Sequence, residues 1–275
     1  DGSVWTFRPG YNAARLNHSA RRLALPELSR EDFVASLVDY VRADVKWVPD
    51  VDGSSLYLRP FMFASEEFVG VHPAGVVDYY VIGSPSGPYF KGGLSGVAIW
   101  VEREYHRAGP GGTGSAKAGG NYAASLLPQI QAEAKGFSQV CFLDTYEGKY
   151  LEELGGMNMF VVMADGTIRT PELTGVILEG GTRSAILRLL RDEGADVREE
   201  KIALSEVVDG IRSGAVAEVF ACGTAAVVTP ITRLGGDDFD VEIEVGDKTR
   251  EIHKRLTDIQ WGRAEDPYGW TYRLV

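Results

Sequence analysis

Apolar residues recur along the chain with two periods, one close to that of a helix and one close to that of a strand. Residues 12–25 and 29–45 carry apolar positions at helical spacing, and Pro26 ends the first of these runs. Ser29 precedes acidic residues, which is typical of a helix N-cap and first turn. The pattern therefore predicts two helices near the N-terminus.

Shorter apolar runs and further helical patterns follow along the rest of the chain. Strands are predicted at residues 3–7, 55–63, 76–83, 97–101, 139–143, 159–163 and 216–221. Further helices are predicted at residues 121–136, 184–193, 205–213 and 249–261. Arg8, Pro9 and Gly10 form a typical turn signal after the first strand. This mixture of elements indicates an α+β fold with two lobes.

A stretch rich in Pro and Gly, residues 84–88, is the strongest linker signal, because these residue types interrupt both helix and strand patterns. A chain of 275 residues is long enough for two ordinary domains. We therefore predict a small domain over residues 1–87, an interdomain loop over residues 88–95 and a large domain over residues 96–275.

Composition and charge argue against several classes of protein. The formal net charge of −11 disfavours nucleic acid or an anionic membrane as a partner. No apolar run is long enough to span a bilayer, and the N-terminal residues lack a basic-then-apolar leader pattern. Cys141 and Cys222 lie far apart without metal-ligand spacing, so we predict no metal site and a reducing, cytoplasmic location.

Lys117 stands among glycines and other small residues in segment 111–122, and Tyr122 follows it five positions later. Glycines remove side chains that would block a flat ring from the backbone. A lysine that forms a Schiff base with a carbonyl group is one chemistry that uses such a setting. The alternative is a flexible Gly-rich loop with an incidental lysine.

Three further segments combine glycines with polar groups. Glu152 and Glu153 precede two glycines between apolar runs, and Gly–Thr turns occur within residues 179–183 and 221–226. The first of these turns precedes a predicted helix, where backbone N–H groups can bind an anion. Each turn taken alone is more readily explained as an ordinary structural turn.

In this order, the motifs resemble those of fold-type IV aminotransferases that depend on pyridoxal 5′-phosphate, most closely bacterial branched-chain aminotransferases. The matching motifs are Lys-Ala-Gly-Gly-Asn-Tyr at 117–122, Glu-x-Gly-Gly-Met-Asn-Met-Phe at 153–160, Gly-x-Thr-Arg at 180–183 and Gly-Thr-Ala at 223–225. The resemblance covers essentially the whole chain. It implies the two-domain architecture of D-amino-acid-aminotransferase-like proteins, with a small domain that is truncated at its N-terminus.

The resemblance also implies a role for each matching residue. Lys117 is expected to be the catalytic Schiff-base lysine, Glu153 to contact the pyridine nitrogen and Tyr122 the phenolic oxygen. The cofactor-binding residues that it implies are Arg15, Lys117, Tyr122, Glu153, Leu178, Gly180, Gly181, Thr182 and Thr224. Because side chains alternate along a strand, only one of Glu152 and Glu153 is expected to serve.

The substrate-binding residues implied by the resemblance are Tyr57, Arg59, Val71, Tyr89, Thr224, Ala225 and Ala226. Arg59 is expected to pair with the distal carboxylate of glutamate. The implied reaction is transfer of the amino group of leucine, isoleucine or valine to 2-oxoglutarate, catalysed by a homodimer. Alternatives are another fold-type IV enzyme, such as aminodeoxychorismate lyase, or an inactive cofactor-binding remnant, because the family's usual N-terminal portion is not in this sequence.

Overall fold

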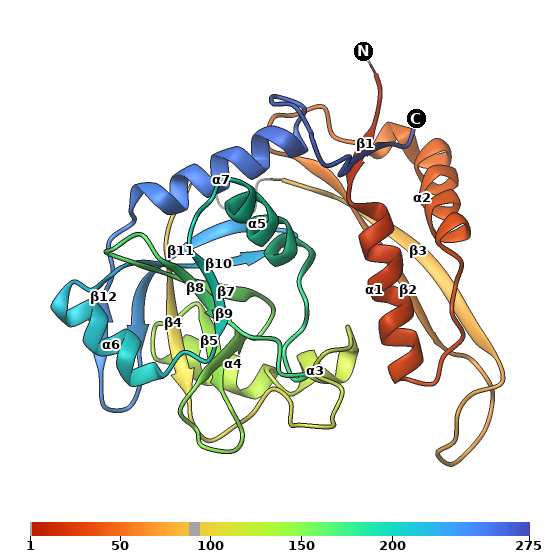
Figure 1. Ribbon diagram of the computed structural model, residues 1–275. Helices are drawn as coiled ribbons and strands as arrows, with labels where there is room; N and C mark the ends of the chain where they lie inside the picture. Colours follow the sequence, from red (N-terminus) through yellow and green to blue (C-terminus); the bar gives the residue numbers. More distant parts are fainter. Residues whose placement is uncertain (1, 88–93) are drawn as a thin grey trace. The chain divides into compact units, whose positions relative to one another are not determined.

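The computed structural model describes residues 2–87 and 94–275, and its ribbon is drawn in Figure 1. The chain forms two compact units: unit 1 contains Asp1–Lys91 and Ile259–Val275, and unit 2 contains Gly92–Asp258. The C-terminal residues join unit 1, because β13 (Thr271–Arg273) pairs antiparallel with β1 (Trp5–Phe7). The large domain predicted over residues 96–275 therefore differs from unit 2 at its C-terminal end.

Unit 1 packs two helices against one face of a long hairpin (Figure 1). Its elements are α1 (Pro9–Arg22), α2 (Arg30–Asp44), the short 3-10 helix η1 (Val45–Trp47), β2 (Ser55–Ala64) and β3 (Val77–Ser86). Phe33, Leu37 and Val41 of α2 are buried against Leu58 of β2 and Val81 of β3. The other face of the hairpin carries Phe61, Phe63 and Tyr80, whose rings stack on one another.

Two turn signals in unit 1 fall partly within regular elements. Pro9 is the first residue of α1, a position where a missing backbone N–H leaves no hydrogen bond unmade. Residues 84–86 of the predicted linker continue β3, with Pro85 opposite Leu56. Proline is tolerated there because this sheet has two strands, so each strand has an edge that needs no ladder hydrogen bond.

The predicted start of the second helix is confirmed. Ser29 is the N-cap of α2, and its hydroxyl oxygen accepts a hydrogen bond from the backbone N–H of Asp32 at 3.0 Å. Glu31 and Asp32 lie in the first turn, where carboxylates interact favourably with the helix dipole.

Unit 2 is built on one sheet in the strand order β6-β5-β4-β11-β10-β7-β8-β9, with β12 paired to β11. The strands are β4 (Val97–Glu102), β5 (Gln139–Leu143), β6 (Leu151–Leu154), β7 (Asn158–Met163), β8 (Ile168–Pro171), β9 (Val197–Glu200), β10 (Val216–Gly223), β11 (Val227–Gly235) and β12 (Asp240–Glu242). β6 turns back onto β7, and the Leu154 N–H donates to the Met157 carbonyl at 2.9 Å. The sheet therefore curls on itself around a buried interior.

Five helices accompany this sheet, and they are α3 (Gly119–Ala123), α4 (Leu126–Ala134), α5 (Gly181–Asp192), α6 (Leu204–Ser213) and α7 (Asp247–Gln260). The single helix predicted over residues 121–136 is broken between α3 and α4. At the break, the Ser125 hydroxyl donates to the Tyr122 carbonyl at 2.7 Å. In the described part of the chain, no helix is long and apolar enough to cross a membrane.

Candidate active site

Lys117 lies in the loop between β4 and α3, with an exposed side chain. Its Nζ atom is 2.6 Å from the hydroxyl oxygen of Tyr122. The buried side chain of Asn121 fixes the loop, because its amide group donates to the carbonyls of Thr113 and Ala116, each at 2.8 Å. These hydrogen bonds hold the backbone of the loop that carries the amine.

Gly114 brings this loop into close contact with the segment that precedes α5. A Cβ atom at Gly114 would overlap the Val176 carbonyl oxygen and approach the Ala108 Cβ to 2.7 Å. The requirement for glycine therefore arises from backbone packing within unit 2. It keeps the lysine loop close to Leu178, one of the predicted cofactor residues.

Glu153 is a buried carboxylate on β6. Its Oε1 atom accepts a hydrogen bond from the Leu178 N–H at 2.7 Å and lies 2.7 Å from Nη2 of Arg107. Burial raises the pKa of Glu153 to about 7, while the charges of Arg107 and Lys117 and the Leu178 amide lower it. The carboxyl group is thus held in position by one hydrogen bond and one ion pair.

Glu152, the neighbour of Glu153, is buried as well. Burial and the nearby charge of Asp144 raise the pKa of Glu152 to about 7. Adjacent residues of a strand point to opposite faces, so Glu152 faces away from the Leu178 amide that holds Glu153. This arrangement leaves Glu153 as the acid closest to the predicted cofactor residues.

Gly180 immediately precedes α5 and has no side chain that could cap the helix. Asn158 packs against it: a Cβ at Gly180 would overlap Asn158 Oδ1, and the Asn158 amide donates to the Leu178 carbonyl at 3.0 Å. Thr182 is buried in the first turn of α5. The N-terminal backbone N–H groups of a helix and a nearby hydroxyl are suited to binding a phosphate.

The loop of residues 224–226 connects β10 to β11, and Gly223 lies opposite Val227 in the register of these strands. A Cβ at Gly223 would lie 3.2 Å from Met157 Cγ, and a Cβ at Gly156 would lie 3.9 Å from Tyr122 Cε1. The β6–β7 turn thus lies beside both the β10–β11 turn and the tyrosine of the lysine loop. Unit 2 brings the predicted cofactor residues of this unit together.

The remaining predicted residues belong to unit 1. Arg15 lies on α1 and donates to Asn12 Oδ1 at 2.9 Å. Arg59 and Tyr57 lie on β2, where Arg59 Nη2 donates to the Tyr57 hydroxyl at 3.3 Å. Val71 is fully exposed in the loop between β2 and β3. Their roles at the site stay predictions.

Tyr89 lies outside the residues that the structure describes. Its predicted role in substrate binding therefore also stays a prediction.

Sequence reasoning missed three residues that build the site: Arg107, Asn158 and Gly114. Asn158 stands inside the Glu-x-Gly-Gly-Met-Asn motif, and Gly114 is part of the Gly-rich segment, so both carried a signal. Arg107 lies ten positions before Lys117 and in no motif that we identified. Its part becomes visible only through the buried ion pair with Glu153.

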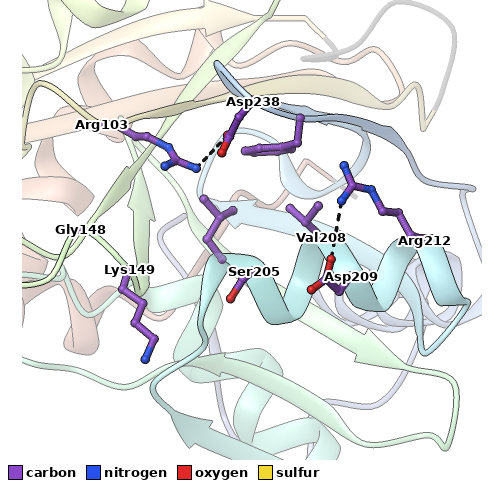
Figure 2. Close-up of a pocket in the computed structure, with 10 residues that line it drawn as sticks. Arg103, Gly148, Lys149, Ser205, Val208, Asp209, Arg212 and Asp238 are labelled. Carbon is purple, nitrogen blue, oxygen red and sulfur yellow. Dashed lines mark hydrogen bonds and ion pairs between the residues drawn. The ribbon is translucent and has the colours of Figure 1, made fainter.

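A separate hollow of about 290 Å³ occurs elsewhere in unit 2, between α6 and neighbouring loops (Figure 2). Two ion pairs lie at its edge: Arg103 is 3.0 Å from Asp238, and Arg212 is 3.6 Å from Asp209. None of the predicted site residues that the structure describes lines this hollow. Within the described residues, no group of His, Cys, Asp and Glu side chains could hold a metal ion.

Comparison with known proteins identifies relatives along the whole chain. A family model described as amino-transferase class IV matches residues 2–234. The branched-chain-amino-acid aminotransferase of Mycolicibacterium smegmatis is 49% identical over 281 aligned residues, which cover all of this chain and 76% of that protein. The branched-chain-amino-acid aminotransferase 2 of Bacillus subtilis is 44% identical, with the same coverage.

Solved structures are similar in fold as well. The branched-chain amino acid aminotransferase of Escherichia coli superposes with a TM-score of 0.84 at 29% identity, covering 99% of this chain and 86% of that one. The branched-chain aminotransferase of the archaeon Thermoproteus uzoniensis, solved with norvaline, gives a TM-score of 0.82 at 28% identity, covering 99% and 86%. The predicted α+β architecture of fold-type IV is thereby confirmed.

Proposed function

The chain belongs to the class IV aminotransferase family, and from this premise we propose that it is a branched-chain-amino-acid transaminase that uses pyridoxal 5′-phosphate. The proposed reaction moves the amino group of leucine, isoleucine or valine to 2-oxoglutarate, giving L-glutamate and the branched-chain 2-oxo acid. Relatives with this substrate in their names, 48–49% identical over the full chain, support the choice of amino acid.

One observation carries the cofactor proposal. Unit 2 contains an exposed lysine amine that donates to a tyrosine hydroxyl, and it also contains a buried carboxylate held by one hydrogen bond and one ion pair. Both contacts of Glu153 go to Oε1, and among the residues described no group donates to Oε2. Oε2 is therefore available to a ligand. A buried ion pair with only a structural role does not require an available oxygen of this kind.

The residues of unit 2 fit pyridoxal phosphate in their chemistry. The aldehyde of the ligand can react with an amine, and its ring nitrogen can pair with a carboxylate. Its phenolic oxygen can accept a hydrogen bond from a hydroxyl, and its phosphate can bind at a helix N-terminus. Lys117, Glu153, Tyr122 and the first turn of α5 supply one group for each. When bound, the cofactor supplies a carbon to which amines add and a ring that withdraws electrons from the substrate Cα.

Lys117, Tyr122 and Glu153 would each have a separate role in the reaction. With pyridoxal phosphate bound, Lys117 would hold the aldehyde carbon through its amine and would serve as the base for the proton of the substrate Cα. Tyr122 contacts the Lys117 amine through its hydroxyl and would donate to the phenolic oxygen. Glu153 would pair with the ring nitrogen and keep a proton there, which would strengthen the withdrawal of electrons.

The turns around Gly180 and Thr224 are the proposed phosphate-binding elements. We propose that the backbone of Gly181 and Thr182 and the hydroxyls of Thr182 and Thr224 hold the phosphate, with Arg15 as its cationic partner. Gly180 is required there, because Asn158 occupies the space of a side chain. Leu178 orients Glu153 through its backbone N–H.

Substrate-binding roles are proposed residue by residue. Arg59, whose guanidinium lies 5.3 Å from the Tyr57 ring centroid, would bind the distal carboxylate of 2-oxoglutarate or glutamate. The loop at Thr224, Ala225 and Ala226 would meet the α-carboxylate through backbone N–H groups. Tyr57, Val71 and Tyr89 would line the apolar side-chain pocket.

The direct test is formation of 4-methyl-2-oxopentanoate and glutamate from leucine and 2-oxoglutarate, measured on protein loaded with pyridoxal phosphate. Lys117→Ala should abolish turnover, and Lys254→Ala, which removes an exposed lysine on α7, should not change it. Glutamate formation by the Lys117→Ala protein at the original rate would refute the proposal. A homodimer and a cytoplasmic location stay predictions, the first testable by sedimentation.

A further inference from the structure

Arg107 is an almost fully buried arginine that joins three segments of the site. Its Nη2 atom lies 2.7 Å from Glu153 Oε1 and donates to the Gly114 carbonyl at 3.1 Å. Its Nη1 atom donates to the Val176 carbonyl at 3.2 Å. The Arg107 and Glu153 side chains are each only 5% exposed. A guanidinium at this depth is costly to bury unless it is paired, so this contact constrains both partners.

We propose that Arg107 is a positioning residue that keeps Glu153 ionised and leaves its Oε2 atom free for the cofactor. The proton shared by Glu153 and the ring nitrogen of the cofactor then stays on the nitrogen. This rests on the proposed use of pyridoxal phosphate. Arg107 and the Leu178 N–H both occupy Oε1, which fixes the rotation of the carboxyl group. The remaining oxygen is thereby oriented without any help from the ligand.

The location of the proton depends on the relative proton affinities of the Glu153 carboxyl group and the ring nitrogen. A proton shared between a carboxyl group and a ring nitrogen resides on the group with the higher pKa. Burial and the neighbouring Glu152 raise the pKa of Glu153, whereas Arg107 and Lys117 lower it. The charge of Glu153 in turn contributes to the raised pKa of the Cys141 thiol. Of the two cations, Arg107 is the one in direct contact with Glu153.

Arg107 also links this proton control to the geometry of the lysine loop. Gly114 lies three residues before Lys117, and its carbonyl shares the Arg107 guanidinium with Val176. Loss of the guanidinium would leave the Gly114 and Val176 carbonyls short of a donor. An amide at this position can replace part of that bonding but not the charge, which allows the two effects to be separated.

The experiment uses pyridoxal phosphate labelled with ¹⁵N at the ring nitrogen, bound to the full chain. The ¹⁵N chemical shift distinguishes a protonated ring nitrogen from an unprotonated one. Arg107→Gln and Arg107→Met remove the charge, Arg107→Lys restores it, and Arg169→Met is the matched control. Arg169 is another largely buried arginine of unit 2, paired with Glu200 and Glu206 and not with Glu153.

Wild type, Arg107→Lys and Arg169→Met should give the protonated shift from pH 6 to 9. Arg107→Gln and Arg107→Met should give the unprotonated shift over at least part of that range. A protonated shift in both charge-removing variants throughout would overturn the inference. Failure of the wild-type protein to bind the cofactor would instead refute the proposed function.

A second measurement needs no cofactor. Without Arg107, Glu153 ionises unpaired in a buried site, which costs stability only at a pH where it is charged. The thermal midpoint of cofactor-free Arg107→Gln should therefore fall further below wild type at pH 8 than at pH 5. Arg169→Met should not show this contrast. An equal loss at both pH values would mean that Arg107 does not control the ionisation of Glu153.

Discussion

The Lys117 amine lies 2.6 Å from the Tyr122 hydroxyl and 4.9 Å from the centroid of its ring. The two residues stand on either side of the start of α3, and Tyr122 is tied to the helix break by the Ser125 hydroxyl. Asn121 holds the same loop from inside unit 2. Residues of the chain itself thus give an exposed amine a defined position, which is the property that covalent amine catalysis requires.

Tyr122→Phe should reduce kcat/KM with leucine by roughly 10- to 100-fold, because a hydrogen bond to a charged or reacting group contributes about 1.5–3 kcal/mol. The folded structure should persist, since the ring remains. Tyr146→Phe is the control, because Tyr146 is 83% exposed in the β5–β6 loop. Unchanged kcat/KM in Tyr122→Phe would show that the hydroxyl has no part in the reaction.

Gly114→Ala should destabilise the protein by about 2–3 kcal/mol, because the new methyl group overlaps the Val176 carbonyl and the backbone has to move. Cofactor binding should weaken too, since the lysine loop is displaced. Gly109→Ala is the matched control: a Cβ there meets nothing within 4 Å. Denaturant unfolding of both variants measures the difference, and equal stability would contradict the packing described here.

The local motifs predicted from the sequence are those whose chemistry lies within a few residues of one another. The Lys117–Tyr122 segment, the Gly180 turn and the Ser29 cap belong to this group. Arg107 was not predictable, because it lies in the loop after β4 while its partner Glu153 lies on β6, and the pair forms only in the folded chain. The division of the predicted helix over residues 121–136 was missed for a similar reason: its break depends on a side chain that bonds back to Tyr122.

Domain assignment shows the same limit. The strand at residues 271–273 has too few residues to give a periodic signal, and it pairs with β1 from the other end of the chain. Proline and glycine at 84–88 predicted a linker, but pairing with β2 carries β3 through Pro85. Long-range pairing outweighs local propensity at both places.

Glu152→Gln should raise the free energy of unfolding of the cofactor-free protein by about 1–2 kcal/mol at pH 8. The pKa of Glu152 is raised to about 7 by burial and by Asp144. When the pKa of an acid is raised in the folded state, the protein loses stability as the pH rises from the ordinary pKa of that acid through about 7. The gain in stability from Glu152→Gln should therefore vanish at pH 4.

The control for this prediction is Glu147→Gln, because Glu147 is exposed on the preceding loop. Its stability relative to wild type should change little between pH 4 and pH 8. A gain for Glu152→Gln that is the same at both pH values would show that ionisation of Glu152 is not its cause.

Arg59→Met should raise KM for 2-oxoglutarate by roughly 10- to 100-fold, the range expected when a charge-assisted hydrogen bond is lost. KM for leucine should change much less, because its side chain has no carboxylate. Arg42→Met, on the exposed face of α2, is the control. An equal rise for both substrates would indicate that Arg59 supports the structure of the pocket and does not select glutamate.

The central claim is that Lys117 is the amine that bonds to pyridoxal phosphate. Reduction of the cofactor-loaded protein with borohydride, followed by peptide mass mapping, tests it directly. The predicted result is one phosphopyridoxyl group on the peptide that contains Lys117, with none on the Lys117→Ala protein. A phosphopyridoxyl group on another lysine of the wild-type chain, with Lys117 unmodified, would contradict the claim.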